Sequence, residues 1–234
     1  MCELNEIDSV ILDMDGTIVL SRDVAVESIR RAAQEIYDNL GIDREPPSEE
    51  KIFESIGMPS PQYFAALFPD MESEQRAAIH RRVYELEGRL LHDGFGCFAP
   101  GAPDALVKLR DMGLKLAMAS NCGNEYFSSN IEVFNLGDYF DIMLCAGMRG
   151  YPEKSVLVEE ILTKFGSRNA MMVGDRYYDI EAALNCGLFP VGCTYGYGTM
   201  EELAEAKALI KDLGELTGLL NGSKKSDGGI NDAV

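Results

Sequence analysis

The sequence predicts an α/β fold in which a parallel sheet is interrupted, after its first strand, by a helical insert. An apolar run near the N-terminus, residues 9–13, is predicted to be a buried strand. Residues from about 24 to 92 then carry apolar side chains at helical spacing almost throughout. After Gly94, predicted strands and helices alternate, and this alternation is typical of a parallel sheet with right-handed crossovers.

The predicted insert contains four helices. The first covers residues 24–40 and ends at Gly41. Pro47 opens the second, because proline suits the first turn of a helix and the acidic residues that follow it interact favourably with the helix dipole. Ser60 begins a short third helix, and residues 73–91 form a long fourth one.

The second half of the sequence alternates between helix and strand. Glycines follow several of the helical patterns and are typical helix stops. The apolar runs between the helices have the length of strands. We expect helices at residues 103–112, 125–134, 154–165 and 180–186, and strands at residues 114–119, 142–146, 170–173 and 190–193.

These patterns predict two domains and a tail. The α/β core comprises residues 1–19 and 94–222, and the helical insert comprises residues 20–93. The tail, residues 223–234, is polar and glycine-rich, and we expect it to be disordered because it offers little apolar surface to bury.

The composition restricts the kinds of partner. Of the 234 residues, 46% are hydrophobic, which is enough for a well-buried core. The net charge of −18 makes a surface that repels nucleic acid and anionic membranes, so we expect neither as a partner. No apolar stretch is long enough to span a membrane, the N-terminus lacks the pattern of a secretion signal, and the six cysteines form no C-x-x-C pair. We therefore expect a cytoplasmic protein.

The most informative segment is residues 10–17, an apolar run that ends in Asp13 and Asp15 and continues with Gly16-Thr17. Carboxylates at the C-terminal end of a strand in an open α/β sheet lie where ligands usually bind. Two acids this close repel each other and lose hydration when buried, so a purely structural role would be costly. A bound divalent cation removes that cost.

Three other apolar runs of the second half also lead into polar residues. Because a parallel sheet places the ends of its strands along one edge, these residues are expected to meet the first acid pair there. Together they combine four carboxylates, a hydroxyl and an ammonium, which indicates a metal site of hard oxygen ligands beside an anion site. The polar residues are Ser120 and Asn121, Arg149 and Lys154, and Asp175 and Asp179.

This set of motifs resembles that of the haloacid dehalogenase-like hydrolase superfamily. Asp13-Met14-Asp15-Gly16-Thr17 resembles the first motif, Ser120 the second, Lys154 the third, and Gly174-Asp175 with Asp179 the fourth, in the family's order and over about residues 1–220. The insert resembles the α-helical cap of the phosphoglycolate phosphatase-like subgroup. The resemblance therefore implies a Rossmann-like parallel-sheet core with an inserted α-helical cap domain.

The resemblance also implies a role for each residue. Asp13 is expected to be the nucleophile that forms an aspartyl phosphate, and Asp15 to protonate the leaving oxygen and then activate water. Lys154 is expected to neutralise charge on the nucleophile and on the transferring group. The expected ligands of Mg²⁺ are Asp13, the backbone carbonyl of Asp15, and Asp175, with Asp179 ordering the metal shell from outside. Contacts with phosphate or substrate are expected from Thr17, Ser120, Asn121 and Gly57.

The third motif departs from its common form. Many relatives have a proline directly after the lysine, whereas here Pro152-Glu153 precede Lys154. Arg149 lies nearby in the sequence and competes for the same role. Lys154 is the preferred residue because it opens a predicted helix, a position from which a cation can reach an anion.

The resemblance implies a phosphoric monoester hydrolase: an Mg²⁺-dependent phosphatase of a small phosphorylated metabolite. Dehalogenase relatives lack the second acid of the first motif, which is Asp15 here. A β-phosphoglucomutase-like sugar-phosphate mutase is the first alternative, although such relatives often have Val in place of Thr17 and His in place of Ala25. A pyrophosphatase of the same fold and a non-catalytic binding protein are the others. For a capped, acidic protein we expect a monomer, with a dimer as the alternative.

Overall fold

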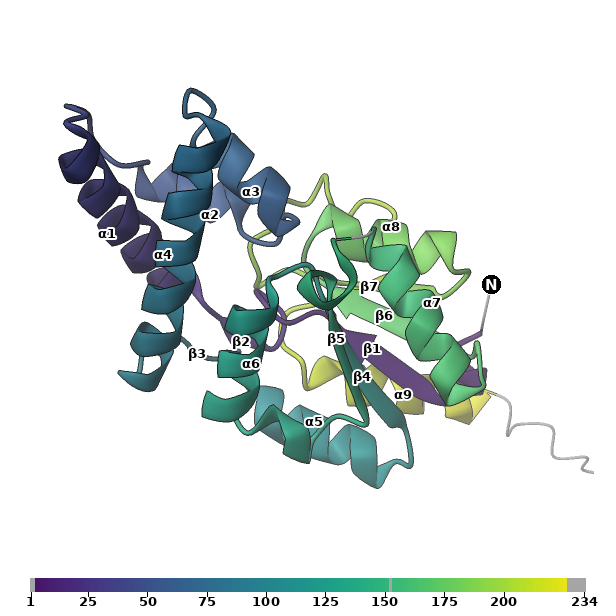
Figure 1. The fold of residues 1–234 in the computed structure, drawn as a ribbon. Coiled ribbons are helices and arrows are strands. Elements are labelled where there is room, and N and C mark those ends of the chain that lie inside the picture. The colour runs from purple at the N-terminus through teal and green to yellow at the C-terminus, as the bar shows by residue number, and fades with distance from the viewer. Residues whose placement is uncertain (1–2, 152, 227–234) are drawn as a thin grey trace, which may run out of the picture.

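The protein is described by a computed structural model that covers residues 3–151 and 153–226. Within these residues the chain forms an α/β core with a six-stranded parallel sheet and a helical insert, as predicted (Figure 1). The order of the strands is β5-β4-β1-β6-β7-β8. Their bounds are β1 (Ser9–Leu12), β4 (Lys115–Ser120), β5 (Ile142–Cys145), β6 (Ala170–Gly174), β7 (Phe189–Cys193) and β8 (Ala208–Ile210).

Strand β1 lies in the middle of the sheet. Ile11 is in register with Ala117 of β4 on one side and with Met172 of β6 on the other. Directly after β1, the Asp13 backbone N–H donates a hydrogen bond to the Val173 carbonyl at 2.9 Å. The first acid of the chain is therefore held at the C-terminal edge of the sheet, beside the end of β6.

Helices cover both faces of this sheet (Figure 1). Val10 and Leu12 of β1 belong to one apolar cluster and Ile11 to another, as expected of a strand that is buried on both sides. The first cluster contains residues of α5 (Ala102–Asp111), α6 (Asn124–Val133) and α9 (Glu215–Ser226), and the second contains residues of α7 (Lys154–Phe165) and α8 (Tyr177–Asn185).

The insert leaves the core between β1 and β4 and has an apolar cluster of its own, in which Tyr37, Phe68 and Ile79 are buried. Its two connections to the core pair with each other as the antiparallel strands β2 (Val19–Leu20) and β3 (Cys97–Phe98). The insert projects from one end of the core in Figure 1. Its helices are α1 (Arg22–Leu40), α2 (Glu49–Ser55), α3 (Ser60–Leu67) and α4 (Ser73–His92).

Several element bounds differ from the predicted ones for local reasons. Helix α2 begins after Ser48 rather than at Pro47, because the Ser48 hydroxyl oxygen accepts the Lys51 backbone N–H and caps the helix. Helix α8 begins at Tyr177, three residues before the predicted start. The chain also has short 3-10 helices at Leu4–Glu6, Leu136–Asp138 and Ala146–Arg149.

The C-terminal part of the chain contains elements that were not predicted, namely β8 and α9. Helix α9 continues through Ser226, into the segment for which a disordered tail was expected. Residues 227–234 of that segment lie outside the described residues. The domain bounds themselves, with the insert at residues 20–93, stay a prediction.

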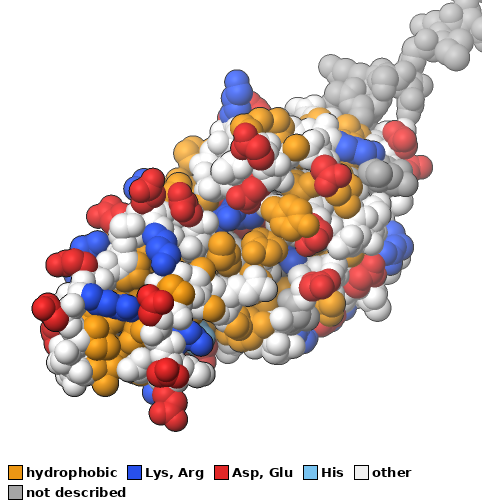
Figure 2. Space-filling model, turned by 90° about the horizontal axis from the view of Figure 1, so that it is seen from above, with side chains coloured by type: hydrophobic (Ala, Val, Ile, Leu, Met, Phe, Trp, Pro, Cys, Tyr) orange, Lys and Arg blue, Asp and Glu red, His pale blue; other side chains and the backbone are white. Residues whose placement is uncertain are grey.

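Two further findings concern the described residues as a whole. Across residues 3–151 and 153–226, no helix is both long enough and apolar enough to cross a membrane. The five cysteines in this part of the chain are free thiols. On the face seen in Figure 2, acidic side chains are spread widely.

Candidate active site

Three acids meet at the C-terminal edge of the sheet. Asp13 follows β1, Asp175 follows β6, and Asp179 lies in the first turn of α8. All three are buried, and one carboxylate oxygen of each lies within 4.8 Å of the others. Carboxylate oxygens gathered in this way are the donors that a hard divalent cation prefers.

Glycines make room for these acids. A Cβ atom on Gly174 would overlap the Asp179 carboxyl group, and a Cβ atom on Gly16 or Gly196 would overlap that of Asp175. Gly16 also has a φ of +80°, which glycine adopts without the steric cost that other residues incur. The glycines of the first and fourth motifs are therefore required by the close approach of backbone to carboxylate.

Lys154, the first residue of α7, brings a buried positive charge to the acids. Its Nζ donates hydrogen bonds to Asp13 Oδ1 at 2.6 Å and to Asp179 Oδ1 at 2.5 Å. Burial acts to lower the pKa of Lys154, but the charges of the two acids outweigh it and hold the pKa above its ordinary value. The competitor, Arg149, is exposed and pairs with Glu160 at 2.8 Å. The structure thus brings Lys154, and not Arg149, to the predicted site.

The acids outnumber the positive charge beside them. Burial raises the pKa of Asp13 well above its ordinary value; Lys154 opposes the shift, and Asp179 and Asp175 add to it. Burial, followed by the charge of Asp179, raises the pKa of Asp175 to about 7, although the Tyr197 N–H donates to Asp175 Oδ2 at 2.6 Å. A bound cation would stabilise the ionised form of each acid.

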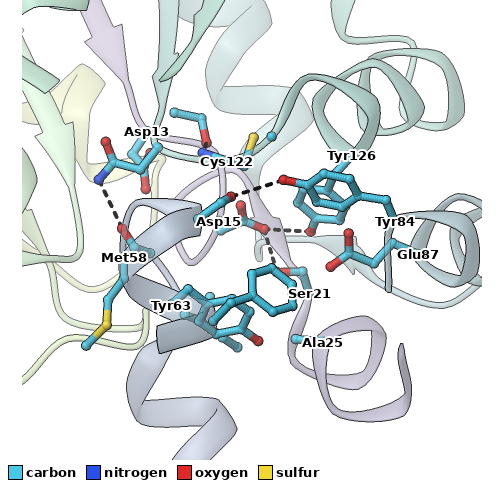
Figure 3. A pocket seen from close by; sticks show the side chains of 17 residues that line it. Asp13, Asp15, Ser21, Ala25, Met58, Tyr63, Tyr84, Glu87, Cys122 and Tyr126 are labelled. Carbon is cyan, nitrogen blue, oxygen red and sulfur yellow. Dashed lines mark hydrogen bonds between the residues drawn. The ribbon is translucent and has the colours of Figure 1, made fainter. Parts of the chain in front are cut away.

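The Asp15 carboxylate has partners of its own. Its Oδ1 accepts hydrogen bonds from the Ser21 hydroxyl at 2.6 Å and from the Tyr126 hydroxyl at 2.7 Å (Figure 3). Burial raises the pKa of Asp15, and the two hydrogen bonds and the charge of Lys154 only partly oppose that shift. A carboxyl group with a raised pKa keeps its proton closer to neutral pH, as a general acid must.

A pocket lies between the core and the insert, with Asp13 and Asp15 on its core side (Figure 3). The space between protein atoms in this pocket, part of which is open to solvent, is about 560 Å³. Ser120, Asn121 and Gly57 line it too, so these three predicted contact residues are brought to the acids.

Asn121 joins the core to the insert. Its Nδ2 donates a hydrogen bond to the Gly57 carbonyl at 3.0 Å, while its buried Oδ1 has no partner in the described part of the chain. Thr17, by contrast, is buried, and its hydroxyl donates to Asp175 Oδ1 at 3.3 Å. Thr17 is not among the described residues that line the pocket, and its contact with a phosphate or substrate stays a prediction.

The sequence patterns did not point to several other residues of this region. Ser21 and Tyr126 belong to no motif, so their contacts with Asp15 could not be read from the sequence. Arg176, to which no role was assigned, donates hydrogen bonds to the backbone carbonyls of Ile56 and Glu54 in the insert. The position of Arg176 inside the fourth motif, next to Asp175, was the one sequence feature that could have pointed to a role at the site.

Comparison with known proteins agrees with this arrangement. Residues 10–192 match the family described as haloacid dehalogenase-like hydrolase. The chain belongs to this family. Among relatives of this haloacid dehalogenase-like hydrolase, the phosphoglycolate phosphatase of Neisseria meningitidis is 26% identical over 220 residues, covering 89% of each chain.

Two more proteins are similar to this hydrolase over most of its length. The pyrophosphatase PpaX of Halalkalibacterium halodurans is 22% identical over 189 residues, covering 78% of this chain and 81% of PpaX. The crystal structure of a predicted phosphoglycolate phosphatase from Haemophilus somnus superposes with a TM-score of 0.81 at 20% identity, covering 93% of this chain and 99% of the other. The latter similarity shows a shared fold.

Proposed function

We propose that this hydrolase is an Mg²⁺-dependent phosphatase that acts on a small phosphorylated metabolite through an aspartyl phosphate on Asp13. The observation that carries the proposal is the position of Asp13, which lines the pocket and also contacts Lys154 at the buried acid cluster. A nucleophile needs such an arrangement, because positive charge must offset the repulsion between a carboxylate and a phosphate dianion. The phosphatase names of the relatives support the same reaction class.

The residues at the sheet edge fit a magnesium ion. Within the proposal, the ligands are Asp13, the backbone carbonyl of Asp15, and Asp175, with Asp179 supporting them through Lys154. The fit rests on an all-oxygen donor set. Burial raises the pKa values of Asp13 and Asp175, and the charges of the neighbouring acids add to that shift, so a bound cation would favour the ionised form of both. When bound, Mg²⁺ supplies positive charge that stabilises the charge of the transferring phosphoryl group.

The side chains then divide the reaction between them. An Asp13 oxygen attacks phosphorus while the bond to the leaving oxygen breaks and Asp15 gives that oxygen its proton. In the second half, Asp15 takes a proton from water, the water oxygen attacks phosphorus, and Asp13 is released as a carboxylate. Lys154 holds Asp13 through both halves, and Ser120 and Asn121 lie in the pocket where they can contact phosphate oxygens.

One pocket residue supports a phosphatase over a sugar-phosphate mutase. Ala25, at the position where mutase relatives often carry His, lines the pocket, and its methyl group cannot transfer a proton. The insert is proposed to act as a lid that excludes bulk water during the first half of the reaction.

The test is phosphate release, with and without Mg²⁺, from p-nitrophenyl phosphate and from a panel of sugar phosphates, nucleoside monophosphates, phosphoglycolate and pyrophosphate. We expect Mg²⁺-dependent release that is lost in Asp13→Asn. Folded protein that releases phosphate from none of these compounds would be a binding protein instead. Interconversion of glucose phosphates without net release would indicate the mutase, and turnover of pyrophosphate alone would indicate the pyrophosphatase.

A further inference from the structure

Glu87 is a buried acid of the pocket for which the proposed reaction has no use. It lies on α4 of the insert, is 8% exposed, and lines the same pocket as Asp13 and Asp15. Its Oε2 has no hydrogen-bond partner in the described part of the chain. Burial, and after it the charge of Asp15, raises the pKa of Glu87 well above its ordinary value. A buried polar atom without a hydrogen-bond partner costs free energy, and a ligand group that pairs with it removes that cost.

The surroundings of Glu87 suit a donor and not an anion. Tyr63, Tyr84 and Tyr126 line the pocket together with Glu87 and Asp15 (Figure 3), and the Tyr126 hydroxyl donates to Asp15 Oδ1. None of the described residues that line this pocket is a lysine or an arginine. An anionic group at this end would therefore lie beside carboxylates and aromatic rings without a neutralising partner.

We propose that Glu87 selects the leaving group of the substrate: it accepts a hydrogen bond from a hydroxyl or ammonium group of a phosphate monoester and disfavours a leaving group that ends in a carboxylate. The inference rests on the proposed phosphatase function, since the phosphate would occupy the Asp13 end of the pocket. A donor group satisfies the unpartnered Oε2, and an ammonium group also gains from the aromatic faces nearby. Phosphoglycolate, whose leaving group carries a carboxylate, is thus a poor substrate of this chain.

The test uses a matched series of alkyl phosphates with two-, three- and four-carbon chains. Each length is prepared with a methyl, hydroxyl, ammonium or carboxylate end, and p-nitrophenyl phosphate reports the chemical step. For the wild-type protein we expect kcat/KM to be at least about tenfold higher for a hydroxyl or ammonium end than for the carboxylate end at the best chain length. The ratio of kcat/KM for the hydroxyl end to kcat/KM for the ammonium end shows which of the two donors is preferred.

Glu87→Gln replaces the ionisable carboxyl group with an amide and keeps the size of the side chain. We expect the preference over the carboxylate end to fall by about tenfold in this variant, and p-nitrophenyl phosphate turnover shows whether the chemical step itself has changed. Glu85→Gln is the matched control, because Glu85 is exposed on the same helix and pairs with Arg82 at 2.8 Å. Melting temperatures show whether each variant folds.

Each result decides for or against the inference. Equal or better turnover of carboxylate ends by the wild-type protein overturns it, and this holds even if Glu87→Gln does not fold. A preference that is unchanged in folded Glu87→Gln overturns it as well. If p-nitrophenyl phosphate is hydrolysed in either case, the proposed function survives; if no phosphate ester is hydrolysed, both proposals fail.

Discussion

The Lys154 ammonium lies 2.6 Å from Asp13 Oδ1, although the two residues are 141 positions apart in the sequence. The contact exists because α7 begins at the same sheet edge at which β1 ends. The same ammonium contacts Asp179 Oδ1 at 2.5 Å, so one buried cation ties two of the three acids together. This arrangement makes several results predictable.

Lys154→Met should reduce kcat/KM by at least about 100-fold, because it removes the positive charge that stabilises the nucleophile and the transferring group. Arg149→Met is the matched control and should stay within about twofold, because an exposed ion pair contributes little. Steady-state phosphate release measures both. The assignment of Lys154 is wrong if Arg149→Met loses turnover while Lys154→Met keeps it. Removing Lys154 leaves buried acids unpaired, so assays are run well below the melting temperature of each variant.

Asp15→Asn should slow the reaction in a way that depends on the leaving group. A general acid contributes roughly 10²- to 10⁴-fold when the departing oxygen needs a proton. We expect a loss of that size in kcat/KM for alkyl phosphates and a much smaller loss in kcat/KM for p-nitrophenyl phosphate, whose leaving group departs without protonation. The parameter kcat/KM is compared because it does not include hydrolysis of the aspartyl phosphate, in which Asp15 also acts. Equal losses on the two kinds of substrate would show that Asp15 does not protonate the leaving oxygen.

The stability of the metal-free protein should fall as the pH rises through neutrality. The pKa of Asp175 is raised from 3.8 to about 7, so the folded chain holds this proton more tightly than the unfolded chain does. The stability that this proton contributes is complete only below the unfolded pKa of 3.8, and it is lost progressively as the pH rises from there through about 7. We expect the melting temperature to drop by roughly 2–5 °C between about pH 6 and about pH 8.

Two controls assign this pH dependence to the acid cluster. Mg²⁺ added at the higher pH should restore much of the lost melting temperature, because a cation that binds only the folded state stabilises it. Asp175→Asn should flatten the profile, because an amide has no proton to lose. A melting temperature that rises with pH in the metal-free protein contradicts the prediction.

Arg176→Met should loosen the contact between the core and the insert. The Arg176 guanidinium donates to the Ile56 and Glu54 carbonyls and pairs with Glu202 at 2.8 Å. We expect KM to rise by about tenfold and hydrogen exchange to become faster in α2. Arg168→Met is the control, because Arg168 is exposed and pairs with Glu159 within the core. Unchanged KM and exchange in Arg176→Met would mean that this contact does not hold the insert against the core.

The acid cluster could be predicted from the sequence because it depends on topology alone. Asp13, Ser120 and Asp175 each lie at or just beyond the end of an apolar run, and parallel strands bring such ends together whatever the details of side-chain packing. Lys154 was harder to assign, because Arg149, a competing cation, lies five residues away. The only feature that favoured Lys154 was its position at the start of a helix, α7.

Other parts of the site depend on tertiary contacts that leave no periodic pattern. The hydrogen bonds of Ser21 and Tyr126 to Asp15 require the insert and α6 to meet over the sheet edge. Glu87 did leave a signal, since it lies among the buried Val83, Leu86 and Leu90 on α4, where an acid breaks the apolar stripe.

The elements that were not predicted are either short or low in intrinsic helix propensity. Strands β2 and β3 have two residues each, too few for a pattern to be recognised. Helix α9 contains Gly218 and Gly222, which lower its intrinsic helix propensity. It forms because Leu216 and Leu220 are buried against the core, a contact that only the folded structure provides.

The proposed reaction depends most directly on a covalent bond between Asp13 and phosphorus. Borohydride reduces an acyl phosphate to the alcohol, so the protein is quenched during turnover of p-nitrophenyl phosphate with Mg²⁺, reduced, digested and analysed by mass spectrometry. We predict homoserine at position 13, absent without substrate and absent in Asp13→Asn. Trapping at a different residue, or an unmodified Asp13 in protein that is turning over under conditions that trap an authentic acyl phosphate, would contradict it.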